Sequence, residues 1–230
     1  MKRLLLLSSS RVHGGGYLDH AEAEIRTFLQ GIPRILFVPY ALHDRDGYAA
    51  VARQRFQQLG IELDSIHESD DPKSAIEQAE AMFVGGGNTF RLLNTLCHYE
   101  LMPWIRERAK AGMRYMGASA GSNLAGPTIK TTNDMPIVQP PSFEALGLVP
   151  FQINPHYIDA DPSSTHMGET REQRLREYLE ESDVPVVAIR EPAIVRVEGE
   201  VITLEGKAGA RIFARGREPY ELASGNLIEL

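Results

Sequence analysis

Short apolar runs alternate with segments of helical periodicity throughout the first half of the chain, and this alternation restricts the possible fold more than any other feature. The apolar runs predict five strands, at residues 3–8, 34–38, 61–66, 81–84 and 113–117. Helical patterns occupy residues 17–30, 46–59, 88–96 and 101–111, and Pro72 starts a further short helix. Strands that alternate with helices at this spacing predict a mostly parallel sheet with helices on both faces, which is a three-layer α/β sandwich.

The second half of the chain has a less regular pattern. Residues 126–150 are rich in Pro, Thr and Asn and are expected as loops, whereas residues 168–181 form a strongly charged helical segment. Short β-rich runs, expected as antiparallel hairpins that close one edge of the sheet, lie at residues 184–189, 193–197, 201–204 and 211–214. No internal repeat or linker interrupts the chain, so we expect one domain over residues 1–230.

The net charge and the cysteine content of the chain limit the binding partners and the cellular location that we expect for it. The net charge of −7 argues against a nucleic-acid-binding surface, which usually carries a basic patch. Cys97 is the single cysteine, so no intrachain disulfide can form, as is typical of a reducing compartment. The apolar run at residues 4–7 is shorter than a signal peptide requires, and no stretch reaches the roughly 18 apolar residues of a membrane span. We therefore expect a cytoplasmic protein that binds neither nucleic acid nor membrane.

A candidate nucleophile follows the fifth predicted strand. Ligands of parallel sheets bind beyond the carboxyl ends of the strands, and residues 117–121 (GASAG) match the G-x-S-x-G nucleophile elbow at that position. Such an elbow needs small residues on both sides of the serine, because neighbouring backbone must pass close to the turn. Ser119 is therefore the candidate nucleophile.

A glycine-rich turn follows the fourth predicted strand, at residues 85–88 (GGGN). Acyl transfer requires two donors aimed at the developing oxyanion, and the N–H of Ala120 is a natural first donor. The glycine turn can supply the second, because glycines allow close approach of the backbone. The turn is not a P-loop, since no Lys follows it, and no dinucleotide-binding G-x-G-x-x-G follows the first strand.

A nucleophilic serine also needs a base and a group that orients the base. His156 follows a predicted strand and an Asn-Pro turn, where active-site residues usually lie, and His166 in a polar loop is the competing histidine. Asp134 and Glu191 are both candidates for the orienting carboxylate. Glu191 gives the chain order Ser…His…Glu and Asp134 gives Ser…Asp…His, and the residues alone leave both possibilities open.

Five sequence blocks resemble the peptidase E family. They are residues 84–90 (VGGGNTF), 117–124 (GASAGSNL), 131–136 (TTNDMP), 153–156 (INPH) and 168–174 (GETREQR). The resemblance spans nearly the whole chain in the same order, and it is weakest after about residue 190. It implies a glutamine-amidotransferase-like, flavodoxin-like α/β fold and hydrolysis of dipeptides with amino-terminal aspartate (Asp-X), with neither metal nor cofactor.

The same resemblance implies roles for individual residues. Ser119 matches the nucleophile and His156 the base, while Gly87 and Ala120 match the oxyanion hole. Glu191 is favoured as the third member, because the order Ser…His…Glu parallels the Cys…His…Glu order of the related amidotransferases. Asp134 would then bind the substrate amine or serve the structure.

Specificity for aspartate requires a cation near the nucleophile. Arg171 is the first candidate, because Arg binds carboxylates through two parallel hydrogen bonds, and Lys130 and Arg190 are competitors. Asn88, at the end of the glycine turn, is the second candidate for substrate binding. The expected partner is a small Asp-X peptide, and the expected assembly is a monomer or homodimer.

Three other functions stay open. Cyanophycinase is a relative with similar motifs, usually a longer chain that cleaves a polymer of aspartate and arginine. A non-catalytic amidotransferase-like binding module is a second possibility, although such a module has no need of both Ser119 and His156. The third is an α/β-hydrolase esterase, which would use the Ser…Asp…His order but lacks an H-G-G-G-type loop before the elbow.

Overall fold

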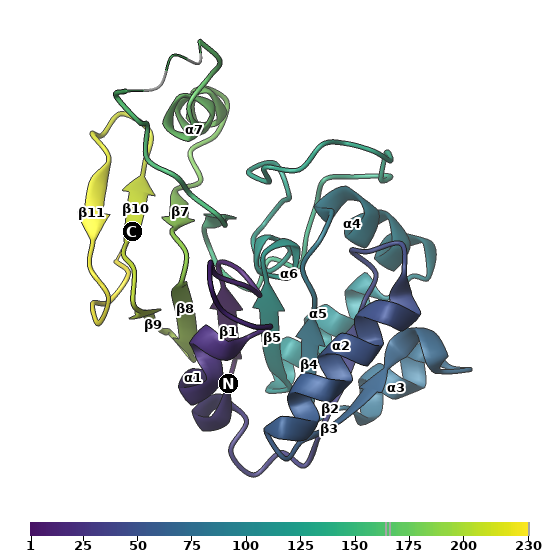
Figure 1. Cartoon of the computed structure of the whole chain (residues 1–230). Coiled ribbons are helices and arrows are strands. Elements are labelled where there is room, and N and C mark those ends of the chain that lie inside the picture. The colour runs from purple at the N-terminus through teal and green to yellow at the C-terminus, as the bar shows by residue number, and fades with distance from the viewer. Residues whose placement is uncertain (164, 166, 230) are drawn as a thin grey trace.

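Five neighbouring strands of the main sheet are parallel, and they are the five that the apolar runs predicted. The computed structural model describes residues 1–163, 165 and 167–229. The main sheet has the order β3-β2-β4-β5-β1-β8-β9, in which β8 and β9 run antiparallel (Figure 1). Its strands are β1 (Arg3–Leu7), β2 (Arg34–Val38), β3 (Glu62–Ser65), β4 (Ala81–Val84), β5 (Arg114–Ala118), β8 (Ala193–Glu198) and β9 (Val201–Gly206).

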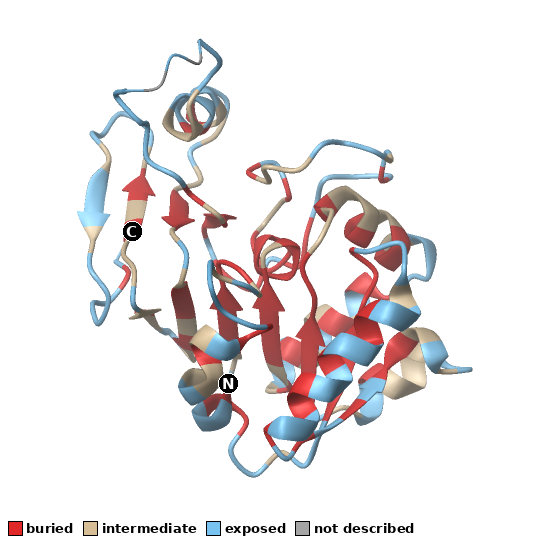
Figure 2. Ribbon diagram, viewed as in Figure 1, coloured by how far each residue is buried: buried red, intermediate tan, exposed pale blue. Residues whose placement is uncertain are grey.

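Helices cover both faces of this sheet, because successive side chains of each strand point to opposite faces. Leu5 and Leu7 of β1 pack in one core, and Leu4 and Leu6 pack in the other. The first core is covered by α1 (Glu22–Phe28) and α2 (Arg45–Gln58). The second is covered by α3 (Pro72–Gln78), α4 (Thr89–His98) and α5 (Met102–Ala111). Figure 2 shows the strands buried and the outer helix faces exposed, which confirms the three-layer α/β prediction.

The first helix is shorter than the sequence pattern suggested. A turn of 3₁₀ helix, η1 (Asp19–Ala21), precedes α1, and Leu18 before it has a φ of 60°. A left-handed residue cannot form part of a right-handed helix, so the helical segment starts after Leu18 rather than at residue 17. A second 3₁₀ turn, η2 (Ile66–Glu68), follows β3.

The expectation that all the carboxy-terminal runs close one edge of the main sheet was wrong. Only the β8–β9 hairpin does so, through pairing of β8 with β1. A second sheet with the order β11-β10-β7-β6 contains the other runs. Its strands are β6 (Gln152–Asn154), β7 (Val186–Ile189), β10 (Ala210–Phe213) and β11 (Tyr220–Leu222).

The reason for this difference is the choice of strand partner. Antiparallel pairing of β7 with β10, and parallel pairing of β7 with β6, draw these runs into a sheet of their own. Leu175 and Leu179 of α7 (Arg171–Glu180) pack on this sheet against Val186 and Phe213. Alternation along a strand indicates which face is buried, but it does not identify the neighbouring strand.

The loops that follow several strands meet at the carboxyl ends of the two sheets. Ser119 follows β5, the glycine turn follows β4, His156 lies two residues beyond β6, and Glu191 lies two residues beyond β7. The long segment 126–150 contains no helix or strand, as expected, and shows only an isolated bridge between Thr128 and Glu144. In the part of the chain that the structure describes, no helix is both long and apolar enough to span a membrane.

Candidate active site

The elbow after β5 holds Ser119 in an unusual backbone conformation. Its φ is 51° and its ψ is −108°, a region that non-glycine residues rarely adopt. Backbone hydrogen bonds hold it there: the N–H of Ser119 donates to Leu7 of β1, and its carbonyl accepts from Ser122 and Asn123. Strain of this kind persists only where the surroundings fix it, and it clusters at functional sites. The serine of the predicted motif therefore lies on a sharp strand-to-helix turn, as a nucleophile elbow requires, and the short helix α6 (Ala120–Asn123) follows it.

Close packing explains the two glycines of the elbow. A Cβ on Gly121 would overlap the carbonyl oxygen of Val84, at the end of β4. A Cβ on Gly117 would lie 2.5 Å from the carbonyl oxygen of Gly121. Both approaches are to backbone atoms, which cannot move aside cheaply. The spacing of the motif thus reflects direct contact between the turn, β4 and α6.

Replacing Gly121 with alanine should destabilise the fold by about 3 kcal/mol or more, because overpacking against rigid backbone forces the elbow to shift. The midpoint of thermal unfolding should fall by roughly 6–12 °C for a chain of this length. Gly15→Ala is a matched control, because its nearest heavy atom would be at an ordinary 3.4 Å. Equal stability of the two variants would contradict this account of the motif.

His156 connects the serine to a carboxylate. Its Nε2 lies 2.6 Å from Ser119 Oγ, and its Nδ1 is hydrogen-bonded to Glu191 Oε1. The neutral imidazole that fits these partners carries its proton on Nδ1, donates it to Glu191, and accepts the serine proton at Nε2. The three side chains therefore have the contacts of a nucleophile, a base and an orienting acid.

The loop that carries His156 is fixed by a residue that the sequence analysis missed. His156 has a φ of 55°, and its N–H donates to Ser8 Oγ at 2.9 Å. Ser8 in turn donates to the carbonyl of Ile189, at 2.9 Å, and Tyr157 N–H donates to the same carbonyl. Ser8 is buried at the end of β1, where no motif distinguishes it from the serines that follow it.

Asp134 has a different set of partners. Its Oδ2 accepts hydrogen bonds from the N–H of Thr89, at 2.7 Å, and from the hydroxyls of Thr89 and Thr132, at 2.6 and 3.1 Å. Thr89 is the first residue of α4, so this carboxylate anchors the start of that helix. No hydrogen bond joins it to His156 among the described residues. The structure thus brings Glu191 to the base, while the competing His166 lies outside the described residues.

The glycine turn after β4 lies directly against the nucleophile. A Cβ on Gly86 would be 3.1 Å from Ser119 Cβ. Gly87 has a φ of +134°, and a Cβ there would be 2.7 Å from the carbonyl oxygen of Ala41, so only glycine fits. Within the part of the chain that is described, no hydrogen bond uses the N–H of Gly87 or of Ala120. These two donors are therefore available to a ligand.

Asn88 uses its side chain within the protein. Its Oδ1 accepts from the N–H of Arg91 and caps α4, and its Nδ2 donates to the carbonyl of Met135 at 2.9 Å. The amide thus fastens the segment after Asp134 to the start of α4. Its role in substrate binding stays a prediction.

The three candidate cations differ in what surrounds them. Arg190 forms two hydrogen bonds with Asp159 and two with Glu221, which occupy its guanidinium and neutralise its charge. Lys130 has an exposed position. Arg171 is half-buried and forms no ion pair with any described residue; its Nη1 donates to the neutral Asn133 Oδ1 at 2.7 Å. Burial, together with Arg174 nearby, lowers the pKa of the Arg171 guanidinium.

The start of α7 determines where Arg171 lies. The helix begins at Arg171 rather than at residue 168, because Thr170 caps it. Thr170 Oγ1 accepts from the N–H of Gln173, and the Gln173 side chain accepts from the N–H of Thr170, which is a complete capping box. The TREQ segment of the sequence carries this signal and places Arg171 in the first turn.

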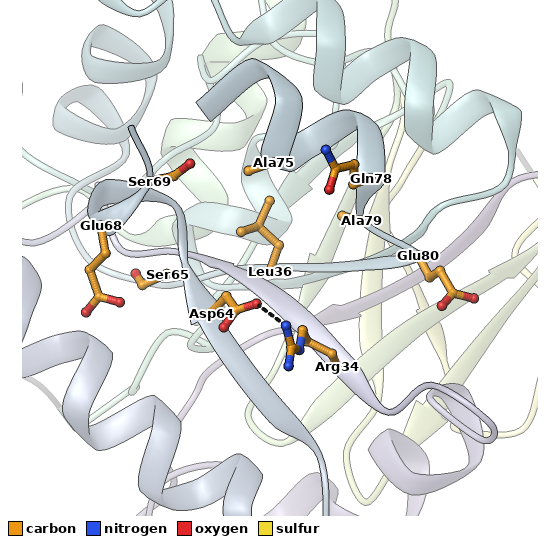
Figure 3. Close-up of a pocket in the computed structure, with 10 residues that line it drawn as sticks. All are labelled: Arg34, Leu36, Asp64, Ser65, Glu68, Ser69, Ala75, Gln78, Ala79 and Glu80. Carbon is orange, nitrogen blue, oxygen red and sulfur yellow. Dashed lines mark ion pairs between the residues drawn. The ribbon is translucent and has the colours of Figure 1, made fainter. Parts of the chain in front are cut away.

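A separate cavity of about 530 Å³ lies between α3 and the edge of the main sheet formed by β2 and β3 (Figure 3). Arg34 at the amino end of β2 forms an ion pair with Asp64 there. None of the predicted site residues lines this cavity. No group of three His, Cys, Asp or Glu side chains among the described residues is arranged to hold a metal ion.

Comparison with known proteins places the chain in a family. The model of "Peptidase family S51" matches residues 4–205. The chain is 55% identical to "Peptidase E" of Streptomyces coelicolor over 97% of this chain and 92% of that protein. It is 47% identical to "Probable alpha-aspartyl dipeptidase" of Drosophila melanogaster over 96% of this chain and 94% of that protein. A solved peptidase from an acI-B1 actinobacterium has the same fold, with a TM-score of 0.72 at 19% identity over 100% of this chain and 97% of that one.

Proposed function

The chain belongs to peptidase family S51 and is a serine dipeptidase, and from this premise we propose that it removes amino-terminal aspartate from dipeptides through Ser119, His156 and Glu191. The observation that carries the proposal is the pair of contacts made by His156, with Ser119 on one ring nitrogen and Glu191 on the other. The name of the Drosophila relative supports aspartate as the first residue of the substrate.

The first half of the reaction forms an acyl-enzyme. His156 Nε2 takes the proton of Ser119 as Oγ attacks the carbonyl carbon of the amino-terminal residue. The tetrahedral oxyanion accepts hydrogen bonds from the N–H groups of Gly87 and Ala120, and Glu191 stabilises the imidazolium. The carbon–nitrogen bond then breaks, and His156 gives its proton to the leaving amine.

The second half releases the first amino acid. Water enters, His156 Nε2 takes one of its protons, and the resulting hydroxide oxygen attacks the ester carbonyl. The bond to Ser119 Oγ breaks, and the proton returns from His156 to that oxygen. Free aspartate leaves, and the enzyme regains its starting state without a metal or cofactor.

Arg171 is the proposed partner of the substrate's aspartate side chain, because it forms no ion pair with any described residue and, of the acidic groups, only the more distant charge of Asp134 acts on it. Arg171→Ala should lower kcat/KM for Asp-Leu about 100-fold, the cost of losing one partner of a desolvated charge pair. Cleavage of Ala-Leu, however slow, should change far less. Steady-state kinetics on both peptides measures the difference.

Arg174→Ala is the matched control for this substitution. It removes an arginine from the same helix, one that is exposed and paired with Glu169 at 3.4 Å. Its kinetics on both peptides should resemble those of the wild type. An equal loss on Asp-Leu and Ala-Leu in the Arg171 variant would show that Arg171 serves the structure and not specificity.

A substrate panel tests the proposed specificity against its alternatives. We expect release of aspartate from Asp-Leu to exceed the cleavage of Ala-Leu, Glu-Leu and a β-aspartyl-arginine dipeptide. Preference for the β-aspartyl-arginine dipeptide would move the assignment to a cyanophycinase-like activity. Failure to cleave any of the four peptides would overturn the proposed substrate and would favour the hypothesis of a non-catalytic binding module. The hydrogen bonds of Asp134 count against an esterase with the Ser…Asp…His order.

Location and assembly are proposed on simpler grounds. We propose that the chain acts in the cytoplasm, because its single cysteine cannot form an intrachain disulfide. We also propose that residues 1–230 form one domain that acts as a monomer or homodimer. The small peptide is its proposed partner, and the net negative charge argues against nucleic acid.

A further inference from the structure

One asparagine side chain connects the candidate aspartate-binding arginine to the loop of the catalytic histidine. Asn133 Oδ1 accepts from Arg171 Nη1 at 2.7 Å and from Asn154 Nδ2 at 3.0 Å. Asn133 Nδ2 donates to the carbonyl oxygen of Pro155 at 2.6 Å. Asn154 is buried and is itself fixed by a hydrogen bond to the carbonyl of Thr131. Asn133 is thus held by contacts on both sides of its amide.

The chemistry of these partners fixes which way the amide faces. A guanidinium can only donate, so the oxygen of Asn133 must face Arg171. A backbone carbonyl can only accept, so the nitrogen must face Pro155. Aspartate at this position would set a carboxylate oxygen against that carbonyl, and alanine would leave both partners without a hydrogen bond.

The peptide group held by Asn133 is the one that enters His156. Its carbonyl belongs to Pro155 and accepts from Asn133, and its N–H belongs to His156 and donates to Ser8 Oγ at 2.9 Å. His156 has a φ of 55°, which costs free energy and persists only when the surroundings fix it from several sides. The side chains of Asn133 and Ser8 therefore hold this peptide group from both sides, and the peptide group in turn orients the imidazole toward Ser119.

We propose that Asn133 is a positioning residue that couples the carboxylate-binding site at Arg171 to the backbone of His156. The same side chain orients the guanidinium for the substrate and holds the strained peptide group of the base. This inference rests on the proposed function, since it assigns Arg171 to the aspartate side chain. Binding of aspartate and activation of Ser119 then depend on one shared side chain.

Two measurements report separately on the His156 end and on the Arg171 end of this coupling. The rate of labelling by a fluorophosphonate probe reports activation of Ser119 without an aspartate group, and KM for Asp-Leu reports the Arg171 end. Asn133→Ala should slow labelling about 5-fold and raise KM for Asp-Leu about 10-fold, the effects of one neutral and one charge-assisted hydrogen bond. Asn133→Asp should slow labelling as well and should raise KM further, because its carboxylate would compete with the substrate for Arg171.

Ser8→Ala is the matched control, because it loosens the other end of the same peptide group and does not touch Arg171. It should slow labelling and leave KM for Asp-Leu unchanged. The double variant Asn133→Ala/Arg171→Ala should have the KM of Arg171→Ala alone, yet label as slowly as Asn133→Ala. Asn133→Ser serves as a second variant if Asn133→Ala does not fold, and thermal unfolding of every variant is measured alongside.

If the wild-type protein cleaves Asp-Leu, any one of three results would overturn the proposed coupling. The first is that Asn133→Ala has the wild-type KM for Asp-Leu, and the second is that it has the wild-type labelling rate. The third is that the KM of the double variant Asn133→Ala/Arg171→Ala is raised by the full product of the two single effects. A wild-type protein that is labelled at Ser119 but releases no aspartate would instead overturn the proposed substrate. The labelling rates of Asn133→Ala and Ser8→Ala would still test the His156 end of the coupling.

Discussion

Replacing Ser119 with alanine should lower kcat for the release of aspartate from Asp-Leu about 10⁶-fold, as removing the nucleophile of such a catalytic unit does. The expected loss is this large because the side chain supplies the atom that forms the acyl-enzyme. His156 cannot compensate, since its Nε2 then has no hydroxyl to deprotonate. The change removes only the hydroxyl oxygen of a half-buried side chain, and backbone hydrogen bonds hold the elbow, so the fold should be preserved.

Ser122→Ala is the control that separates chemistry from the fold of the elbow. The hydroxyl of Ser122 is buried and lies within hydrogen-bond distance of the carbonyls of Leu7 and Gly117, at 2.7 and 2.9 Å, to which it donates its single proton. This variant should lose stability and keep most of its kcat. Retention of substantial activity by Ser119→Ala would exclude Ser119 as the nucleophile, whatever the behaviour of Ser122→Ala.

Replacing Glu191 with glutamine should lower kcat about 10⁴-fold, the effect known for an amide in place of the orienting acid of a serine triad. The amide nitrogen would donate to His156 Nδ1 and would force the ring proton onto Nε2. That tautomer faces Ser119 with a donor and cannot accept its proton. Steady-state kinetics on Asp-Leu provides the comparison.

Asp134→Asn is the matched substitution at the competing carboxylate. Its three hydrogen bonds all come from Thr89 and Thr132, so the change should loosen the start of α4 and reduce activity much less. If Asp134→Asn were the more damaging change, the contact between His156 and Glu191 would not be the catalytic one. If neither change slowed the reaction, neither carboxylate would orient the base.

The central fold followed from the sequence because β1, β2, β4 and β5 are buried on both faces. Such strands appear as continuous apolar runs, and the predicted limits of β2 and β4 agree with the structure to the residue. The second sheet was missed because a short apolar run such as β7, which is fully buried, carries no signal for the strand it pairs with. β11 was not predicted at all, since Tyr220 and Glu221 are exposed and the run has only three residues.

Some residues of the candidate site could likewise be predicted from the sequence, and others could not. The motif at residues 117–121 indicated Ser119 through a packing requirement that leaves a mark on the sequence, namely small residues at fixed positions. The proposal of Arg171 rather than Arg190 as the aspartate-binding residue needed coordinates, because the ion pairs of Arg190 join residues 31 positions apart. Ser8 and Asn133 were missed for the same reason: His156 and Ser8 are separated by 148 positions, and a hydrogen bond at that distance has no local pattern.

Titration of Ser119 with a fluorophosphonate, followed by assay of aspartate release from Asp-Leu, tests the account most directly. The adduct is located by mass spectrometry, and the remaining activity is plotted against the fraction of Ser119 that carries it. We predict that activity falls in proportion to labelling and reaches zero when Ser119 is fully modified. Aspartate release that continues after full modification, or that is lost while Ser119 stays unmodified, would contradict the assignment of Ser119 as the nucleophile of this dipeptidase.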